Sequence, residues 1–135
     1  MNCKKLTVKD LMSSYLYTVN PKEMLTDVCA HMSGRNIGLA LIMEDGRLIG
    51  VFSERDLLHL IGTLGSDLES IRVSAVMTTE IDTISEDARL EDGIRHMLEQ
   101  HRRHLIVTRD GDPVGVFSLR SAKLLELINP LQPTQ

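Results

Sequence analysis

The chain has 135 residues, of which 42% are hydrophobic and 25% charged, and it carries a formal net charge of −4 at pH 7. This length suits one compact domain or two small repeats that share a core. The acidic balance and the aromatic content of 3% argue against nucleic-acid binding, because such proteins usually present a basic face or rings on which bases stack.

No apolar run is long enough to span a membrane, and the N-terminus lacks the apolar run of a signal peptide. The two cysteines, Cys3 and Cys29, are too few for a disulfide framework and lack the spacing of a zinc site. We therefore expect a cytoplasmic protein that contacts neither a membrane nor nucleic acid.

The chain repeats itself at a shift of 65 residues. GVFSER, from Gly50, matches GVFSLR, from Gly115, and Asp45-Gly46 matches Asp110-Gly111. Self-similarity at a fixed shift indicates two copies of one structural unit. We divide the chain into a first repeat with its lead-in (1–62), a linker (63–72), a second repeat (73–129) and a C-terminal tail (130–135).

Each repeat predicts the element order β-α-β-β-α. Apolar residues recur at helical spacing from Leu25 and again from Leu90, and each Asp-Gly pair between apolar runs is typical of a tight hairpin turn. In the first repeat we expect a lead-in at 8–12, a strand at 17–19, a helix at 25–32, hairpin strands at 39–43 and 47–52, and a helix after Ser53. In the second repeat the equivalents are 73–77, 82–84, 90–98, 105–107, 114–117 and a helix after Ser118.

One repeat of about 60 residues buries only a modest core, and its three-stranded sheet needs a cover for an apolar face. We expect the other repeat to provide that cover. The predicted fold class is α/β (α+β), with two repeats related by a pseudo-twofold axis and sheets packed between helices.

The segment GVFSERD, residues 50–56, is the sharpest candidate for a binding site. A helix that begins at Ser53 presents backbone N–H groups that favour an anion, and Asp56 can accept hydrogen bonds from a vicinal diol such as ribose. Gly50 would let a ligand approach the backbone closely. The alternative is a capping box, in which Ser53 and Asp56 satisfy the helix start. Ser121 stands at the position of Asp56 in the second repeat, so the fold of a repeat does not require this carboxylate. The difference between the repeats therefore favours a binding role for Asp56.

The order of these motifs resembles a tandem pair of CBS domains, the regulatory modules named after cystathionine β-synthase. The resemblance covers about residues 6–128. The residues that carry it are Val8-Lys-Asp-Leu-Met12, Thr18-Val19 with Pro21, both Asp-Gly hairpins, GVFSERD, and Val76-Met77-Thr78 with Thr83-Ile84.

The resemblance implies a stand-alone regulatory module that binds an adenosine-containing ligand between its repeats and modulates a separate, unknown partner protein. The implied ligands are AMP, ADP or ATP, with S-adenosylmethionine or NAD as further possibilities, and no cofactor is required. Family members commonly form homodimers. Catalysis is not expected, because the chain has no nucleophile elbow, P-loop, HExxH or GxGxxG motif.

Carried over residue by residue, the resemblance implies two pockets. The better pocket comprises Ser53, Arg55, Asp56, Ile81, Asp82, Thr83, Arg102, Arg103 and His104. The weaker second pocket comprises Tyr17, Thr18, Ile37, Gly38, Leu39, Ser118, Arg120 and Ser121.

The second pocket lacks both the carboxylate and the basic run HRRH, which begins at His101. A hydrogen bond to a charged partner contributes about 1.5–3 kcal/mol, so its loss weakens binding roughly ten- to a hundredfold. We therefore expect one competent nucleotide site per chain.

Other interpretations stay open. The basic run could be a solvated patch at the negative end of the preceding helix dipole. The chain could be a homodimeric adaptor that binds no ligand, which Glu54 beside the proposed phosphate favours. Apolar residues on the last helix of each repeat favour burial between chains: Leu57, Leu58, Leu60 and Ile61, and Leu124, Leu125, Leu127 and Ile128.

A third interpretation is a metal- or redox-responsive protein that uses His96, His101 and His104, or Cys3. It is less favoured, because the first two histidines are five residues apart, off the same helical face, and no carboxylate or cysteine completes a ligand set.

Overall fold

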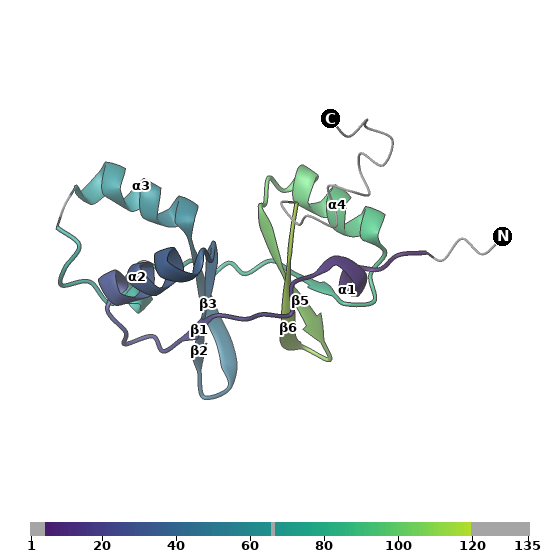
Figure 1. Ribbon diagram of the computed structural model, residues 1–135, viewed down its shortest axis with the longest axis horizontal. Coiled ribbons are helices and arrows are strands. Elements are labelled where there is room, and N and C mark those ends of the chain that lie inside the picture. The colour runs from purple at the N-terminus through teal and green to yellow at the C-terminus, as the bar shows by residue number, and fades with distance from the viewer. Residues whose placement is uncertain (1–4, 66, 120–135) are drawn as a thin grey trace. The chain divides into compact units, whose positions relative to one another are not determined.

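The computed structural model describes residues 5–65 and 67–119, which belong to two compact units (Figure 1). The contiguous unit is Leu16–Ile81. The split unit combines residues of Met1–Tyr15 with residues of Asp82–Gln135. Each unit therefore holds the sheet of one sequence repeat and the lead-in of the other.

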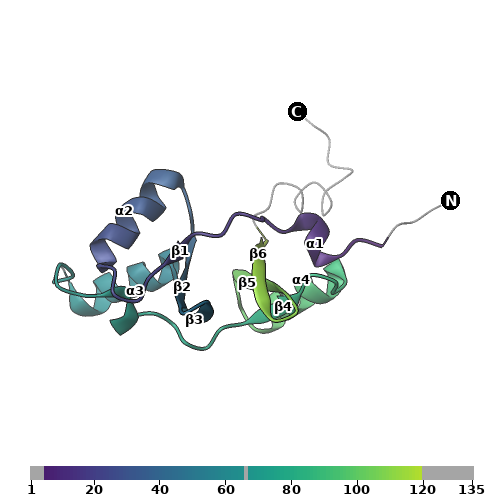
Figure 2. The same ribbon diagram turned by 90° about the horizontal axis from the view of Figure 1, so that it is seen from below.

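The contiguous unit contains a three-stranded sheet in the order β1-β2-β3. Strand β1 runs parallel to β2, and β2 is antiparallel to β3. Helices α2 and α3 lie on the same face of this sheet in both views (Figures 1 and 2). The bounds are β1 Thr18–Val19, α2 Leu25–Arg35, β2 Leu39–Glu44, β3 Arg47–Ser53, α3 Glu54–Leu64 and a 3-10 helix, η1, at Val73–Ala75.

The split unit repeats this plan with the order β4-β5-β6 and the same strand directions. Helices α1 and α4 lie on one face of its sheet (Figures 1 and 2). The bounds are α1 Val8–Leu11, β4 Thr83–Ser85, α4 Leu90–Glu99, β5 His104–Arg109 and β6 Asp112–Ser118. The helix expected after Ser118 lies outside the described residues. Two mixed sheets with helices confirm the predicted α+β class.

The hairpin turns follow the prediction from the Asp-Gly pairs. Asp45 and Gly46 have φ of 51° and 76°, and Asp110 and Gly111 have φ of 50° and 86°. Two successive positive φ angles define the turn whose twist matches that of paired strands, and glycine adopts this conformation at little cost. Each turn therefore sets the register of its own hairpin.

Each unit has an apolar core between its sheet and its helices. Phe52 and Phe117, at equivalent places in β3 and β6, are both fully buried. The core of the contiguous unit is Tyr17, Val19, Leu25, Val28, Met32, Ala40, Ile42, Phe52 and Val73. The core of the split unit is Val8, Leu11, Met97, Leu105, Val107 and Phe117.

The lead-in of each repeat is held by the last strand of the other repeat's hairpin. In the contiguous unit, Val51 and Thr78 exchange two backbone hydrogen bonds of 2.9 and 2.8 Å. In the split unit, Ser13 and Val116 exchange two bonds of 2.9 Å. These bonds occupy backbone groups on strands that would otherwise be sheet edges.

A methionine of each lead-in packs over a glycine of the strand beside it. A Cβ atom at Gly50 would meet Met77 Sδ, and one at Gly115 would meet Met12 Sδ and lie 2.8 Å from the Ser13 carbonyl oxygen. The expectation that Gly50 makes room for a ligand is therefore wrong in this structure, because a methionine side chain fills the space.

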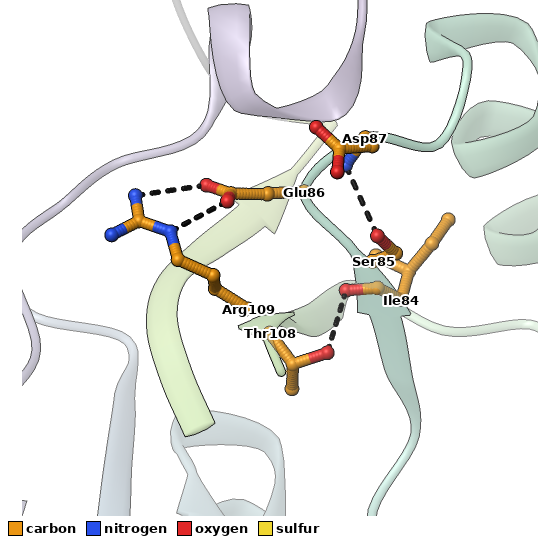
Figure 3. Close-up of polar contacts among 6 residues, drawn as sticks. All are labelled: Ile84, Ser85, Glu86, Asp87, Thr108 and Arg109. Carbon is orange, nitrogen blue, oxygen red and sulfur yellow. Dashed lines mark hydrogen bonds and ion pairs between the residues drawn. The ribbon is translucent and has the colours of Figure 1, made fainter. Parts of the chain in front are cut away.

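In the split unit the buried residue Glu86 contacts the lead-in through its backbone. Its carboxylate pairs with Arg109 (Figure 3). The Arg109 guanidinium donates to Glu86 through Nε at 2.6 Å and through a terminal nitrogen at 3.1 Å. The Glu86 backbone accepts from Lys9 N–H at 3.0 Å and donates to the Thr108 carbonyl at 2.9 Å. Glu86 thus joins α1 to strand β5, and the Arg109 hydrogen bond holds the pKa of Glu86 below its usual range.

Alanine at either glycine should destabilise the fold, and Gly115→Ala should cost more than Gly50→Ala. The flexible Met77 side chain can move aside, whereas the Ser13 backbone is held by its own hydrogen bonds. Overpacking typically costs about 1–3 kcal/mol. Urea unfolding of both variants and of the Gly50→Ala/Met77→Ala and Gly115→Ala/Met12→Ala pairs checks this. We expect the effects of the two substitutions on the unfolding free energy to be strongly non-additive only in the Gly50→Ala/Met77→Ala pair. Equal non-additivity in both pairs would show that the Ser13 backbone does not limit the space at Gly115.

Glu86→Gln should destabilise the protein at neutral pH but not at low pH. A carboxyl whose pKa is lowered by folding stabilises the folded state above its unfolded pKa of about 4.3, and that contribution is lost as the pH falls through the lower folded value. The difference in unfolding free energy between wild type and variant should therefore shrink between about pH 6 and pH 3.

Urea unfolding followed by far-UV circular dichroism at several pH values measures this difference. The control is Glu91→Gln, because the Glu91 side chain is 63% exposed and its ion pair with Arg89 contributes little. A Glu86→Gln difference that stayed constant down to pH 3 would show that the carboxylate charge does not stabilise the fold.

Candidate functional site

Ser53 and Asp56 form a capping box at the start of α3. The Ser53 N–H donates to Asp56 Oδ2 at 2.8 Å, and the Asp56 N–H donates to Ser53 Oγ at 3.2 Å. The Glu54 N–H donates to the Gly38 carbonyl oxygen at 3.1 Å. The capping alternative is therefore present in the structure, and the expectation that the helix start offers free N–H groups to an anion is wrong at Glu54 and Asp56.

The cap leaves the Asp56 carboxylate with binding capacity. A carboxylate has two oxygens and about four acceptor positions, and the cap bond occupies Oδ2. Asp56 is half-buried and the adjacent Arg55 is exposed. The box therefore holds the carboxylate in one orientation while Oδ1 can still accept from a hydroxyl group.

A second polar cluster lies at the start of β4. Asp82 Oδ1 is 2.7 Å from His96 Nε2, and Arg102 Nε donates to Asp82 Oδ2 at 3.2 Å. The three side chains come from the segment before β4, from α4 and from the connection between α4 and β5. This arrangement brings Asp82 and Arg102 of the predicted better pocket together, and it adds His96, which the sequence suggests only as a candidate metal ligand and not as a residue of that pocket.

The first repeat holds the equivalent contact without the charges. Tyr17 and His31 stand at the positions of Asp82 and His96 under the 65-residue shift, and the Tyr17 hydroxyl is 3.2 Å from His31 Nδ1. Ile37 stands at the position of Arg102. The signal for His96 was therefore present in the sequence, as a histidine conserved between the two repeats opposite a polar residue in each.

The remaining predicted residues are distributed over both units. Leu39 pairs with Ser53 within the contiguous unit, and His104 pairs with Ser118 within the split unit. Thr83 and Arg103 are exposed, and Ile81 is half-buried. Arg120 and Ser121 lie outside the described residues. Because each predicted pocket draws on both units, the two pockets stay predictions.

Within the described residues, no group of three or more His, Cys, Asp or Glu side chains could hold a metal ion. Burial raises the pKa of the Cys29 thiol, which makes its reactive thiolate form scarcer. Cys3 lies outside the described residues. No helix within 5–65 and 67–119 is long and apolar enough to cross a membrane.

The CBS domain family model matches residues 8–63 and 73–123 of the chain. A CBS domain-containing protein of Bacillus subtilis, YhcV, is 28% identical over 91% of this chain and 87% of its own length. An uncharacterized conserved protein from Pyrococcus horikoshii has a crystal structure that matches with a TM-score of 0.83 at 25% identity, over 97% of this chain and 98% of that one.

The crystal structure of CBSX2 in complex with AMP matches with a TM-score of 0.75 at 26% identity. The match covers 94% of this chain and 98% of CBSX2.

Ser53→Ala should lower the unfolding free energy by about 1 kcal/mol, because it removes the side-chain acceptor at the start of α3. Ser53→Asp should retain most of the stability, since aspartate is an equally good N-cap residue. Urea unfolding measures both values. If Ser53→Ala were as stable as wild type, the capping box would contribute nothing to the fold.

Proposed function

This chain belongs to the CBS domain family, and we propose that it binds an adenosine-containing ligand and thereby regulates a separate protein. CBS domain pairs are typically regulatory modules without catalysis. The observation that carries the proposal is the AMP complex of CBSX2, which this chain matches over nearly its whole length. AMP, ADP or ATP is the proposed ligand class, and S-adenosylmethionine and NAD are the competing candidates.

We assign the ribose to Asp56. Its orientation in the capping box supports this role, because the carboxylate is held in place before any ligand arrives. Ser53 and Arg55 flank it on the same turn. Preorganisation of this kind reduces the entropy lost on binding.

We assign the phosphate to the basic residues that precede and begin β5, Arg102, Arg103 and His104, and the base to the segment Ile81, Asp82 and Thr83. Arg102 and Arg103 are exposed and lie in the short connection between α4 and β5. We further propose a single competent site, since Ile37 and Tyr17 replace the charged residues in the other repeat.

A second candidate function is the adaptor that binds no ligand. The structure offers one observation in its favour, because Asp56 and Arg102 both have partners within the protein. Leu57 and Leu60 are half-buried and pack against the core of their own unit, so only part of each side chain is accessible to the partner chain that we expect. Leu58, Ile61 and Leu64 are exposed by 72%, 47% and 46%, and a homodimer through this stripe stays a prediction.

Thermal unfolding with AMP, ADP, ATP, S-adenosylmethionine, NAD or zinc tests the proposal. A ligand present at about 100 times its dissociation constant should stabilise the folded state by about 2.7 kcal/mol. We expect such a shift with at least one of the adenine nucleotides. Stabilisation by no adenosyl compound would favour the adaptor, and stabilisation by zinc alone would favour a metal-responsive protein.

Asp56→Asn is the variant that separates binding from folding. Asparagine keeps an oxygen acceptor for the Ser53 N–H but removes the charge, so the cap should survive while the ribose contact weakens. The dissociation constant for AMP should rise roughly tenfold or more. Unchanged affinity in a folded Asp56→Asn variant would contradict the assignment of the ribose.

A further inference from the structure

One carboxylate in the split unit serves two partners. Asp82 presents Oδ1 to His96 at 2.7 Å and Oδ2 to Arg102 at 3.2 Å. The Asp82 side chain is 22% exposed, whereas that of Arg102 is 40% exposed. Asp82 is therefore the more enclosed of the pair, and the Arg102 side chain is the more accessible to an anion.

We infer that Asp82 determines how strongly the site prefers a phosphorylated ligand, because its carboxylate competes with the ligand phosphate for Arg102. This inference rests on the proposed function, and it concerns the selectivity of the site rather than its existence. A phosphate that contacts Arg102 must displace the carboxylate from Nε or share the guanidinium with it. A ligand without phosphate meets no such competition.

His96 makes the competition possible because it holds the other oxygen of Asp82. The carboxylate keeps that hydrogen bond when Arg102 turns to a phosphate, so release of the arginine does not leave Asp82 without a partner. Arg102 Nε can also return to Oδ2 when the ligand leaves. The cluster thus supplies an internal anion that occupies the cation whenever no phosphate is bound.

The equivalent residues of the first repeat lack the charges of this cluster. Tyr17 and Ile37 replace Asp82 and Arg102, so that repeat has neither the cation nor the competing carboxylate. The Tyr17–His31 contact shows that the histidine is kept with a neutral partner. The charges, rather than the histidine contact itself, therefore distinguish the two repeats.

The experiment measures the ratio of the dissociation constant of adenosine to that of AMP, which isolates the contribution of the phosphate and rises as that contribution grows. Isothermal titration calorimetry at pH 7.5 and low salt gives this ratio for wild type, Asp82→Asn, Arg102→Gln and the double variant. We expect Asp82→Asn to raise the phosphate contribution about three- to tenfold, since it frees Arg102 from a partly exposed ion pair. High salt should reduce the increase.

Arg102→Gln should lower the ratio, and the double variant should behave like Arg102→Gln, because Asp82 acts on the phosphate through Arg102. The control for overall charge is Asp87→Asn, which makes the same change on an exposed residue of the split unit that bonds Ser85 Oγ through its backbone N–H. It should leave the ratio unchanged. Circular dichroism confirms that each variant is folded. If Asp82→Asn does not fold, an Arg102→Gln ratio equal to that of wild type would still overturn the inference, because Arg102 would then make no contact with the phosphate for which Asp82 could compete.

The inference is overturned if adenosine and AMP both bind but Asp82→Asn leaves the ratio unchanged or lowers it. It is also overturned if Asp82→Asn raises the ratio equally with and without Arg102, since the effect would then be general electrostatics. Failure of the proposed function differs from both results, because the wild-type chain would then bind neither adenosine nor AMP.

Discussion

The fold depends on the exchange of two lead-in segments between sequence repeats. Each segment pairs with the last hairpin strand of the other repeat, through Val51 and Thr78 in one unit and Ser13 and Val116 in the other. A methionine beside each pairing lies over a glycine that has no side chain to obstruct it. Because of this exchange, neither repeat contains all the residues of its own compact unit, and the two halves of the chain are mutually dependent.

The features that the sequence predicts well are local. The Asp-Gly turns, the start of α3 at Ser53 and the helical spacing from Leu25 and Leu90 each depend on residues close in the chain, and the structure confirms them. The repeat adds a second, independent copy of each signal, which makes the order of elements predictable. The family could be recognised for the same reason.

The features that the sequence did not predict join distant segments. Gly50 was interpreted as space for a ligand, but its neighbour is Met77, and no local pattern reveals that the lead-in of the second repeat returns to the first hairpin. The contact of His96 with Asp82 also spans two elements. For Asp56 the sequence is compatible with two roles, a helix cap and a ribose acceptor. Only the structure establishes that its carboxylate accepts a hydrogen bond from the Ser53 backbone N–H.

The two units share a plan but differ in where they place charge. The split unit contains the ion pairs of Asp82 with Arg102 and of Glu86 with Arg109. The contiguous unit has Tyr17, Ile37, Pro21 and Glu44 at the corresponding positions. The two copies share one scaffold, and the substitutions remove both of these ion pairs from the contiguous unit.

The split unit also constrains the order in which the protein can assemble during synthesis. All residues of the contiguous unit have been synthesised once Ile81 has been translated, so this unit can begin to fold before the split unit is complete. The strand that holds Ser13 is made much later, at Val116. Until then Val8 and Leu11, which end up fully or almost fully buried, have no sheet to cover. Val8 and Leu11 must therefore wait for the strand that contains Val116, and they stay unburied while the residues in between are synthesised.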